Sequence, residues 1–145
     1  MTSYAAQTTV DTGRSREEIE RTLTRFHASK VAWLRDDEAG RVVLAFTRKQ
    51  RSYRFILELP KITDPDIQRT PQTKVRRDPK RIQEVLEQER RRRFRSLANF
   101  LKATLDAIDT GIISEEAALL SNLILPSGMT VQEFLAEMSN RLYSE

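Results

Sequence analysis

Hydrophobic residues recur at helical spacing after Ser15. The tetrapeptide Ser15–Glu18 (SREE) has the composition of a capping box, in which Ser accepts a hydrogen bond from the third helical amide and Glu reaches back. Ile19, Leu23 and Phe26 then mark one face. This pattern predicts a helix of about 13 residues beginning at Ser15. We expect residues 1–14 to form a disordered lead-in.

Alternating apolar and polar residues predict three strands. Val31–Leu34 is short and contains the single tryptophan, Trp33. Arg41–Arg48 and Tyr53–Leu59 alternate, so that every second residue is apolar and points to one face. Polar turns separate the three segments, which is typical of an antiparallel meander with one face on a core.

A long helix is predicted from Pro79 to about Asp109, with Asp78 as its N-cap. It would be about 46 Å long, whereas a compact domain of this size has a radius of gyration of about 15 Å. The helix must therefore project, bend or pack in an oligomer. Its apolar stripe is interrupted at Arg90, which must reach solvent, pair with an acid or mark where the helix leaves the core.

Two shorter helices are predicted near the C-terminus. Ser114 caps one that ends at about Asn122, and the capping box Thr130–Glu133 opens an amphipathic helix with Phe134, Leu135, Met138 and Leu142. The fold class is therefore α+β: an N-terminal helix, a three-stranded antiparallel meander, a long basic helix and two short C-terminal helices. Residues 15–145 are expected to form a single domain, with residues 61–78 as a basic loop.

The composition excludes several kinds of chemistry. The 145 residues include no cysteine and one histidine, so thiol nucleophiles, thiolate metal sites and His-rich metal centres are excluded. None of the phosphate-loop, dinucleotide, nucleophile-elbow or zinc-protease motifs occurs. We therefore expect a protein that is not an enzyme and has no cofactor or metal. A metal-dependent nuclease using Asp36, Asp37 and Glu38 ranks well below the other hypotheses, because these acids fit a turn.

The charge is unevenly distributed. The chain has 25 basic and 21 acidic side chains, a net charge of +4. Residues 69–95 hold 11 basic and 4 acidic residues (+7), residues 1–68 hold 12 and 10 (+2), and residues 96–145 hold 2 and 7 (−5). Such a division indicates either an anionic partner or a contact between subunits.

The basic segment supplies the candidate site for nucleic acid, of which DNA is the expected form. Arginine presents donors suited to phosphate, and the binding would depend on salt. The candidate residues are Arg69, Lys74, Arg76, Arg77, Lys80, Arg81, Arg90, Arg91, Arg92, Arg93 and Arg95. Acids of the C-terminal region are candidate partners for Arg90.

A second hypothesis is a protein–protein interaction module. Glu87–Arg91 and Glu89–Arg93 are favourable i,i+4 pairs, so the charged helix could simply be solvated or lie between subunits. Its contacts would come from Phe94, Leu97, Leu101 and Leu105. The partner would be a second copy or a different protein.

No membrane or export signal is evident. Residues 1–14 lack the basic and apolar regions of a signal peptide, and no apolar run approaches the roughly 20 residues that a bilayer span needs. We expect no membrane partner and a cytoplasmic location.

Four segments together resemble a family of small uncharacterised proteins from bacteriophages, prophages and other mobile elements. They are Ser15–Ala28 (SREEIERTLTRFHA), Arg69–Pro71 (RTP), Arg91–Leu97 (RRRFRSL) and Ile124–Leu135 (ILPSGMTVQEFL). This chain has His27 where that family usually has Gly, and Phe94 where it usually has Trp. The resemblance implies an intracellular phage-type role alongside DNA replication or recombination genes, in a bacterial or phage-infected cell. It also makes a phage or host protein, whose complex this chain would inhibit or adapt, a candidate partner.

Overall fold

The computed structural model describes the backbone of residues 2–144 and the side chains of residues 12–143. The fold is α+β, as the sequence predicts. The order of elements is α1 (Thr2–Arg25), β1 (Ser29–Asp36), β2 (Arg41–Arg48), β3 (Arg51–Glu58), α2 (Pro65–Gln68), α3 (Pro79–Asp109), α4 (Glu115–Leu119), the 3-10 turn η1 (Leu120–Asn122) and α5 (Val131–Ser144).

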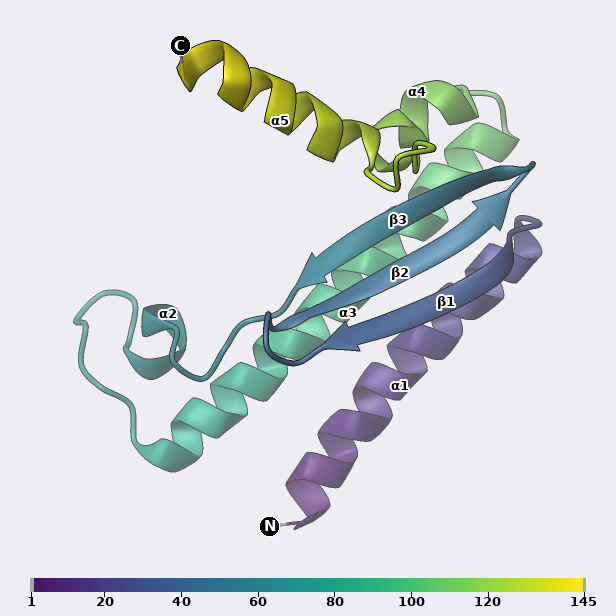
Figure 1. Cartoon of the computed structure of the whole chain (residues 1–145). Helices are drawn as coiled ribbons and strands as arrows, with labels where there is room; N and C mark the ends of the chain where they lie inside the picture. Colours follow the sequence, from purple (N-terminus) through teal and green to yellow (C-terminus); the bar gives the residue numbers. More distant parts are fainter. Residues whose placement is uncertain (1, 145) are drawn as a thin grey trace.

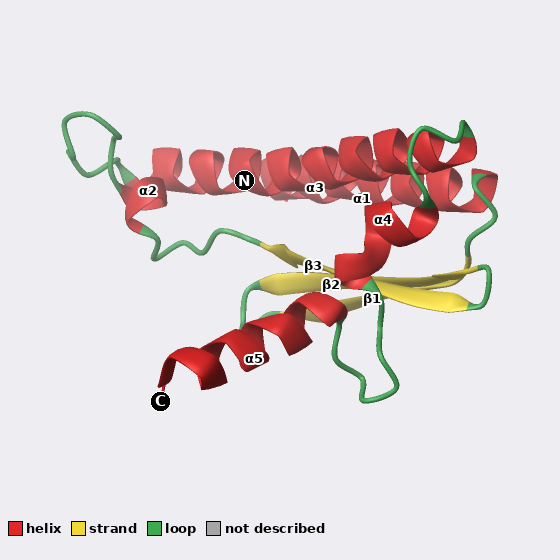
Figure 2. Cartoon of the chain, turned by 90° about the horizontal axis from the view of Figure 1, so that it is seen from above, coloured by secondary structure: helices red, strands yellow, loops and turns green. Residues whose placement is uncertain are grey.

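The three strands form an antiparallel sheet in the order β1-β2-β3. Helices α1 and α3 lie side by side across one face of this sheet, whereas α5 lies on the opposite side (Figures 1 and 2). The core fills the space between the helices and the sheet. It contains Ile19 and Leu23 from α1, Phe46 and Tyr53 from the sheet, and Leu101 from α3.

The predicted strand faces are confirmed. Leu44 and Phe46 of β2 are buried, and they alternate with half-buried residues on the other face. The register pairs Leu44 with Phe55 and Phe46 with Tyr53, so the aromatic rings of β2 and β3 meet on the covered face. The ring centroids of Phe46 and Tyr53 are 5.6 Å apart. The structure extends β1 and β3 beyond the predicted Val31 and Tyr53 starts.

The N-terminal helix begins earlier than predicted. Helix α1 starts at Thr2, so Ser15 lies inside it and does not cap its beginning. The side chains of residues 1–11 lie outside the described ones, and the separation of a lead-in (1–14) from the domain (15–145) stays a prediction. The helix ends as His27 turns into the left-handed region at φ 65°. The Ala28 amide then donates to the Leu23 carbonyl at 2.8 Å, which closes the last turn.

The predicted bounds of α3 are confirmed. The Asp78 side chain accepts from the Arg81 amide at 3.0 Å, and Gly111 adopts φ 83° just after the helix. The N-terminal part of α3 extends past the end of the sheet (Figure 1). Ile67 of α2 covers it there by packing against Ile82 and Leu86, which form a second, smaller hydrophobic cluster. The long helix therefore projects from the main core.

The C-terminal segment crosses the edge of the sheet. Leu123 pairs with Tyr53, and the Ile124 amide donates to the Ser52 carbonyl at 2.9 Å. Helix α5 then begins at the predicted capping box, because the Glu133 amide donates to the Thr130 hydroxyl at 3.2 Å. Its apolar side chains, Phe134, Leu135, Met138 and Leu142, are exposed and do not join the core.

Candidate nucleic-acid interface

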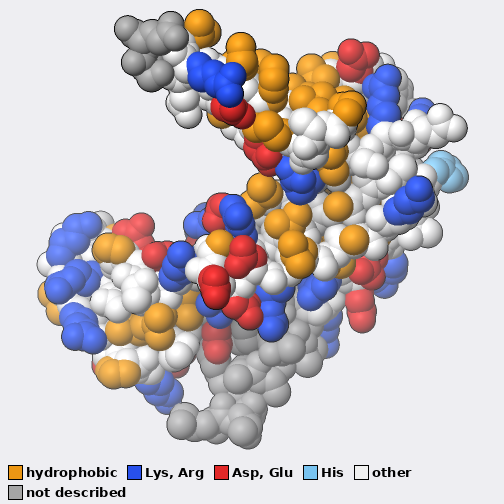
Figure 3. All heavy atoms as spheres, viewed as in Figure 1, with side chains coloured by type: hydrophobic (Ala, Val, Ile, Leu, Met, Phe, Trp, Pro, Cys, Tyr) orange, Lys and Arg blue, Asp and Glu red, His pale blue; other side chains and the backbone are white. Residues whose placement is uncertain are grey.

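The most basic projecting part of the molecule is the segment of residues 65–81, here called the basic hook. It contains α2, the turn that follows and the first residues of α3. Figure 3 shows Lys and Arg side chains gathered along the outer edge of this segment. Six basic and two acidic residues give it a net charge of 6 − 2 = +4. One of the acids, Asp78, is already bound to the backbone as the cap of α3.

The hook has a defined backbone. Arg69 pairs with Arg76 as an isolated bridge, and the Thr70 amide donates to the Val75 carbonyl at 2.9 Å. The Arg77 amide donates to the Gln68 carbonyl at 2.7 Å. These bonds fold the turn back on itself, so the basic side chains project from a shaped segment and not from an extended linker.

The cations of the hook have different surroundings. Lys74, Arg76 and Lys80 are exposed and make no side-chain ion pair within the described part of the chain. Arg69 is also exposed, and its Nη1 donates to the Lys74 carbonyl at 2.9 Å. Arg77 is half-buried, and its Nη1 donates to the Ile67 carbonyl at 3.1 Å. Arg77 therefore holds the hook together, while the other basic side chains face solvent.

The arginine run of α3 does not form one surface. Arg93 donates to the Glu58 carbonyl at 2.8 Å, and Arg92 is 3.7 Å from the Glu89 carboxylate. Arg90 is half-buried and its Nε is fully buried, whereas Arg91 and Arg95 share a different face because they are four residues apart. The predicted set of eleven residues is thus divided between the hook and several sides of one helix.

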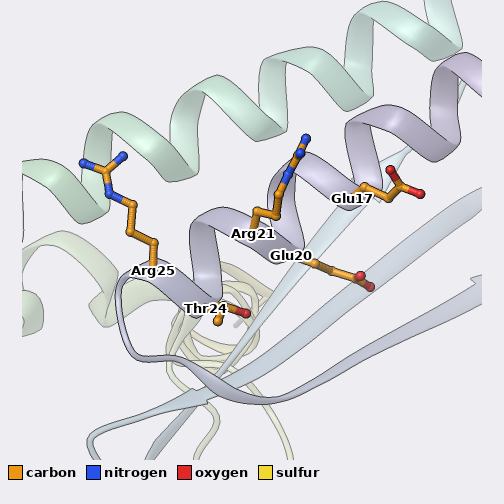
Figure 4. A pocket seen from close by; sticks show the side chains of 5 residues that line it. All are labelled: Glu17, Glu20, Arg21, Thr24 and Arg25. Atoms are coloured by element: carbon orange, nitrogen blue, oxygen red, sulfur yellow. The ribbon is translucent and has the colours of Figure 1, made fainter.

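Three further cations lie along the seam between α1 and α3. Arg21, Arg25 and Lys102 line one shallow cleft of about 260 Å³, together with Glu18. Figure 4 shows Arg21 and Arg25 extending from α1 on the side of α3, while Glu20 extends the other way. The sequence shows Arg21 and Arg25 as an i,i+4 pair, but only tertiary packing brings Lys102 beside them. Because acids interrupt this seam, its charge is mixed.

A larger cleft, the one drawn in Figure 4, has a volume of about 530 Å³. All five residues that line it belong to α1: Glu17, Glu20, Arg21, Thr24 and Arg25. A space bounded by the side chains of one helix is a surface groove, and it offers no converging polar groups from different elements. We therefore do not assign the nucleic-acid site to this groove.

The interaction residues predicted on α3 are buried within the chain. Phe94, Leu97, Leu101 and Leu105 have 9 % or less of their surface exposed. Leu97, Leu101 and Leu105 belong to the main core, and Phe94 lies against Trp33 with ring centroids 6.4 Å apart. The stripe that we expected to meet a partner instead faces α1 and the sheet, so a contact surface must lie elsewhere.

Among the residues that the structure describes, no acid of the C-terminal region pairs with Arg90. Glu115 forms a buried ion pair with Arg48, and Glu133 accepts from Arg54 at 2.9 Å. The hydrogen bond from Arg54 holds the pKa of Glu133 below its ordinary value. These acids instead tie α4 and α5 to the sheet.

Arg48 was not among the residues that sequence reasoning selected. Its Nε donates to the Phe26 carbonyl at 2.9 Å, and the hydroxyl of Tyr53 donates to Glu115 at 2.7 Å. Burial raises the pKa of Tyr53. The sequence does contain one indication of this buried position: Arg48 follows Phe46 by two residues and therefore lies on the core face of β2.

The acidic turn after β1 has a structural use. Asp36 accepts from the Ala39 amide at 3.1 Å, and Asp37 lies 3.0 Å from the Arg35 guanidinium. Over the described residues, no group of three or more His, Cys, Asp or Glu side chains is arranged to hold a metal ion. In the same part of the chain, no helix has both the length and the apolar character needed to cross a membrane.

Comparison of the chain with protein-family models, with curated proteins and with solved structures finds no match.

Proposed function

We propose that this protein is a small nucleic-acid-binding accessory protein that contacts the phosphate backbone through the basic hook. The observation that supports this most is the exposure of Lys74, Arg76 and Lys80 on a projecting, hydrogen-bonded segment. Side chains of this kind neutralise phosphates and release counterions without reading the base sequence.

The shape of the hook also favours this use. It extends past the end of the sheet at the N-terminus of α3, so a strand could reach it without meeting the main body of the domain (Figure 1). Its backbone is already ordered, and less conformational entropy is lost on binding than for a flexible loop. DNA is the proposed form of nucleic acid, in keeping with the resemblance to phage proteins. The proposed setting is a phage-type intracellular role in replication or recombination, without enzymatic activity.

The test compares two triple variants of equal charge. The hook variant is Lys74→Glu, Arg76→Glu and Lys80→Glu, and its control is Lys49→Glu, Lys102→Glu and Arg141→Glu, which changes exposed cations away from the hook. Both lower the net charge equally. Gel-shift titrations with single- and double-stranded DNA and RNA at low salt should show loss of binding in the hook variant only. Equal loss in both variants would indicate a general charge effect, and no binding by the unmodified protein would refute the proposal.

The exposed apolar face of α5 favours a second candidate function, that of a protein–protein interaction module. Phe134, Leu135, Met138 and Leu142 recur at helical spacing and remain at least 40 % exposed. The outer face of the sheet adds Leu34 and Ile56, which align across the strands through Val43. Apolar groups gathered in this way are typical of interaction surfaces.

This surface replaces the buried α3 stripe as the proposed site of contact with a second copy, or with a phage or host complex. Sedimentation equilibrium over a wide concentration range should show association of the unmodified protein, and Leu135→Glu with Met138→Glu should abolish it. The control is Gln132→Glu with Asn140→Glu, on the same helix. A monomer at all concentrations would exclude self-association.

A further inference from the structure

A cleft of about 420 Å³ lies between α1, the adjoining ends of β1 and β2 with the turn that joins them, and the middle of α3. Four arginines from α1, β1, β2 and α3 line it, together with two aspartates: Arg16, Arg35, Arg41, Arg90, Asp36 and Asp37. The residues are widely separated in sequence, and the cleft exists only because α1 and α3 pack on the same face of the sheet.

The two aspartates already have partners. Asp37 lies 3.0 Å from Nε of Arg35, and Asp36 lies 3.8 Å from Nε of Arg41. Four cations and two anions leave a net charge of 4 − 2 = +2 in the cleft. The excess charge belongs to Arg16 and Arg90.

The surroundings of Arg90 indicate that the cleft binds a ligand. The Nε of Arg90 is buried and makes no hydrogen bond within the described part of the chain. Burying a hydrogen-bond donor without an acceptor costs free energy of folding. The cost is larger when the donor belongs to a charged guanidinium on an otherwise apolar stripe. Arg90 lies on that stripe between the cluster of Ile82 and Leu86 and the main core. Arg90 also lines the cleft, so an acceptor that enters the cleft would meet its guanidinium group.

Arg16 supplies the second open cation. Its guanidinium lies over the Trp33 ring, 4.8 Å from the centroid, so it is held in place without an acidic partner there. The Trp33 ring is itself fixed, because its Nε1 donates to Glu20 at 2.9 Å. Arginine pairs bind phosphate oxygens through several N–H groups at once.

We infer that this cleft binds a terminal phosphate monoester, either of a free nucleotide or of the end of a nucleic-acid strand. A phosphate monoester carries about −1.5 to −2 charges at neutral pH, which matches the +2 of the cleft better than the single charge of a phosphodiester. This site is separate from the basic hook and would bind its ligand whether or not the hook binds a strand.

The experiment uses the fluorescence of Trp33, the single tryptophan, because a ligand that engages Arg16 alters the surroundings of that ring. Adenosine monophosphate should change the emission in a saturable way, while adenosine should not. Arg90→Gln and Arg16→Gln should each weaken binding by about tenfold or more. Arg92→Gln, on the same helix but outside the cleft, and the triple hook variant should bind adenosine monophosphate unchanged.

Two oligonucleotides distinguish the sources. Preference for a 5′-phosphorylated over a 5′-hydroxyl strand would assign the site to strand ends, and no such preference, with the monophosphate still bound, would assign it to nucleotides. If Arg90→Gln lowers the melting temperature of the protein, the affinity of Arg16→Gln is the result that decides. The inference is overturned if neither phosphorylated probe binds, if adenosine binds equally well, or if Arg16→Gln leaves the affinity unchanged.

Discussion

The guanidinium of Arg48 forms an ion pair with the carboxylate of Glu115, and both side chains are largely buried between the sheet and α4. Arg48 also donates to the Phe26 carbonyl, which follows α1, and Glu115 accepts from Tyr53. One charged pair thereby joins the end of α1, two strands and the first residue of α4.

We expect Glu115→Ala to lower the free energy of unfolding by about 3 to 5 kcal/mol, because it leaves the Arg48 charge buried without a partner. Urea unfolding followed by circular dichroism measures this. The double variant Arg48→Met with Glu115→Leu should recover much of the loss, since no charge then remains buried. A loss below about 1 kcal/mol in the single variant would show that water solvates Arg48.

The salt dependence of DNA binding distinguishes the hook from the full basic segment. Five cations of the hook face solvent: Arg69, Lys74, Arg76, Lys80 and Arg81. If these make the contacts, log Kd plotted against log salt should have a slope of magnitude about 4 to 5 for duplex DNA. Contact by all eleven predicted residues would give about 10. Titrations at several salt concentrations measure the slope, and a value near the larger number would require the arginines of α3 as well.

The Arg54–Glu133 pair should make the attachment of α5 sensitive to acid. The pKa of Glu133 is lowered in the folded protein, so its contribution to stability is present above the unfolded-state pKa and is lost as pH falls through the folded-state value. Glu133→Gln should reduce stability at neutral pH by about 1 kcal/mol or less, because the pair is partly exposed. The difference from the unmodified protein should shrink below about pH 4. A difference that is constant between pH 3 and pH 7 would contradict this assignment.

His27 adopts φ 65° immediately after the last turn of α1. Side chains with a Cβ are strained there and glycine is not, so His27→Gly should raise the free energy of unfolding by about 1 kcal/mol. His27→Ala is the control and should give no comparable gain, because it keeps the Cβ. Thermal or urea unfolding measures both.

The sequence by itself determined most of the local structure. The bounds of α3 follow from Asp78, Pro79 and Gly111, whose backbone preferences act over a few residues. The strand faces follow from strict alternation, because a register with the wrong face inward would expose Phe46 and Tyr53. The N-cap at Ser114 and the capping box at Thr130–Glu133 likewise act within one helical turn.

Tertiary structure decided which of these surfaces are covered. The α3 stripe and the α5 stripe are both amphipathic in sequence, yet Leu101 is buried and Leu135 is exposed. The difference arises because α1 and the sheet cover α3, while the pairing of Leu123 with Tyr53 directs α5 to the other side. The partners of Arg48 and the surroundings of Arg90 also come from distant elements. Local sequence pattern carries no information about such contacts, because burial and pairing of charge depend on which elements pack together.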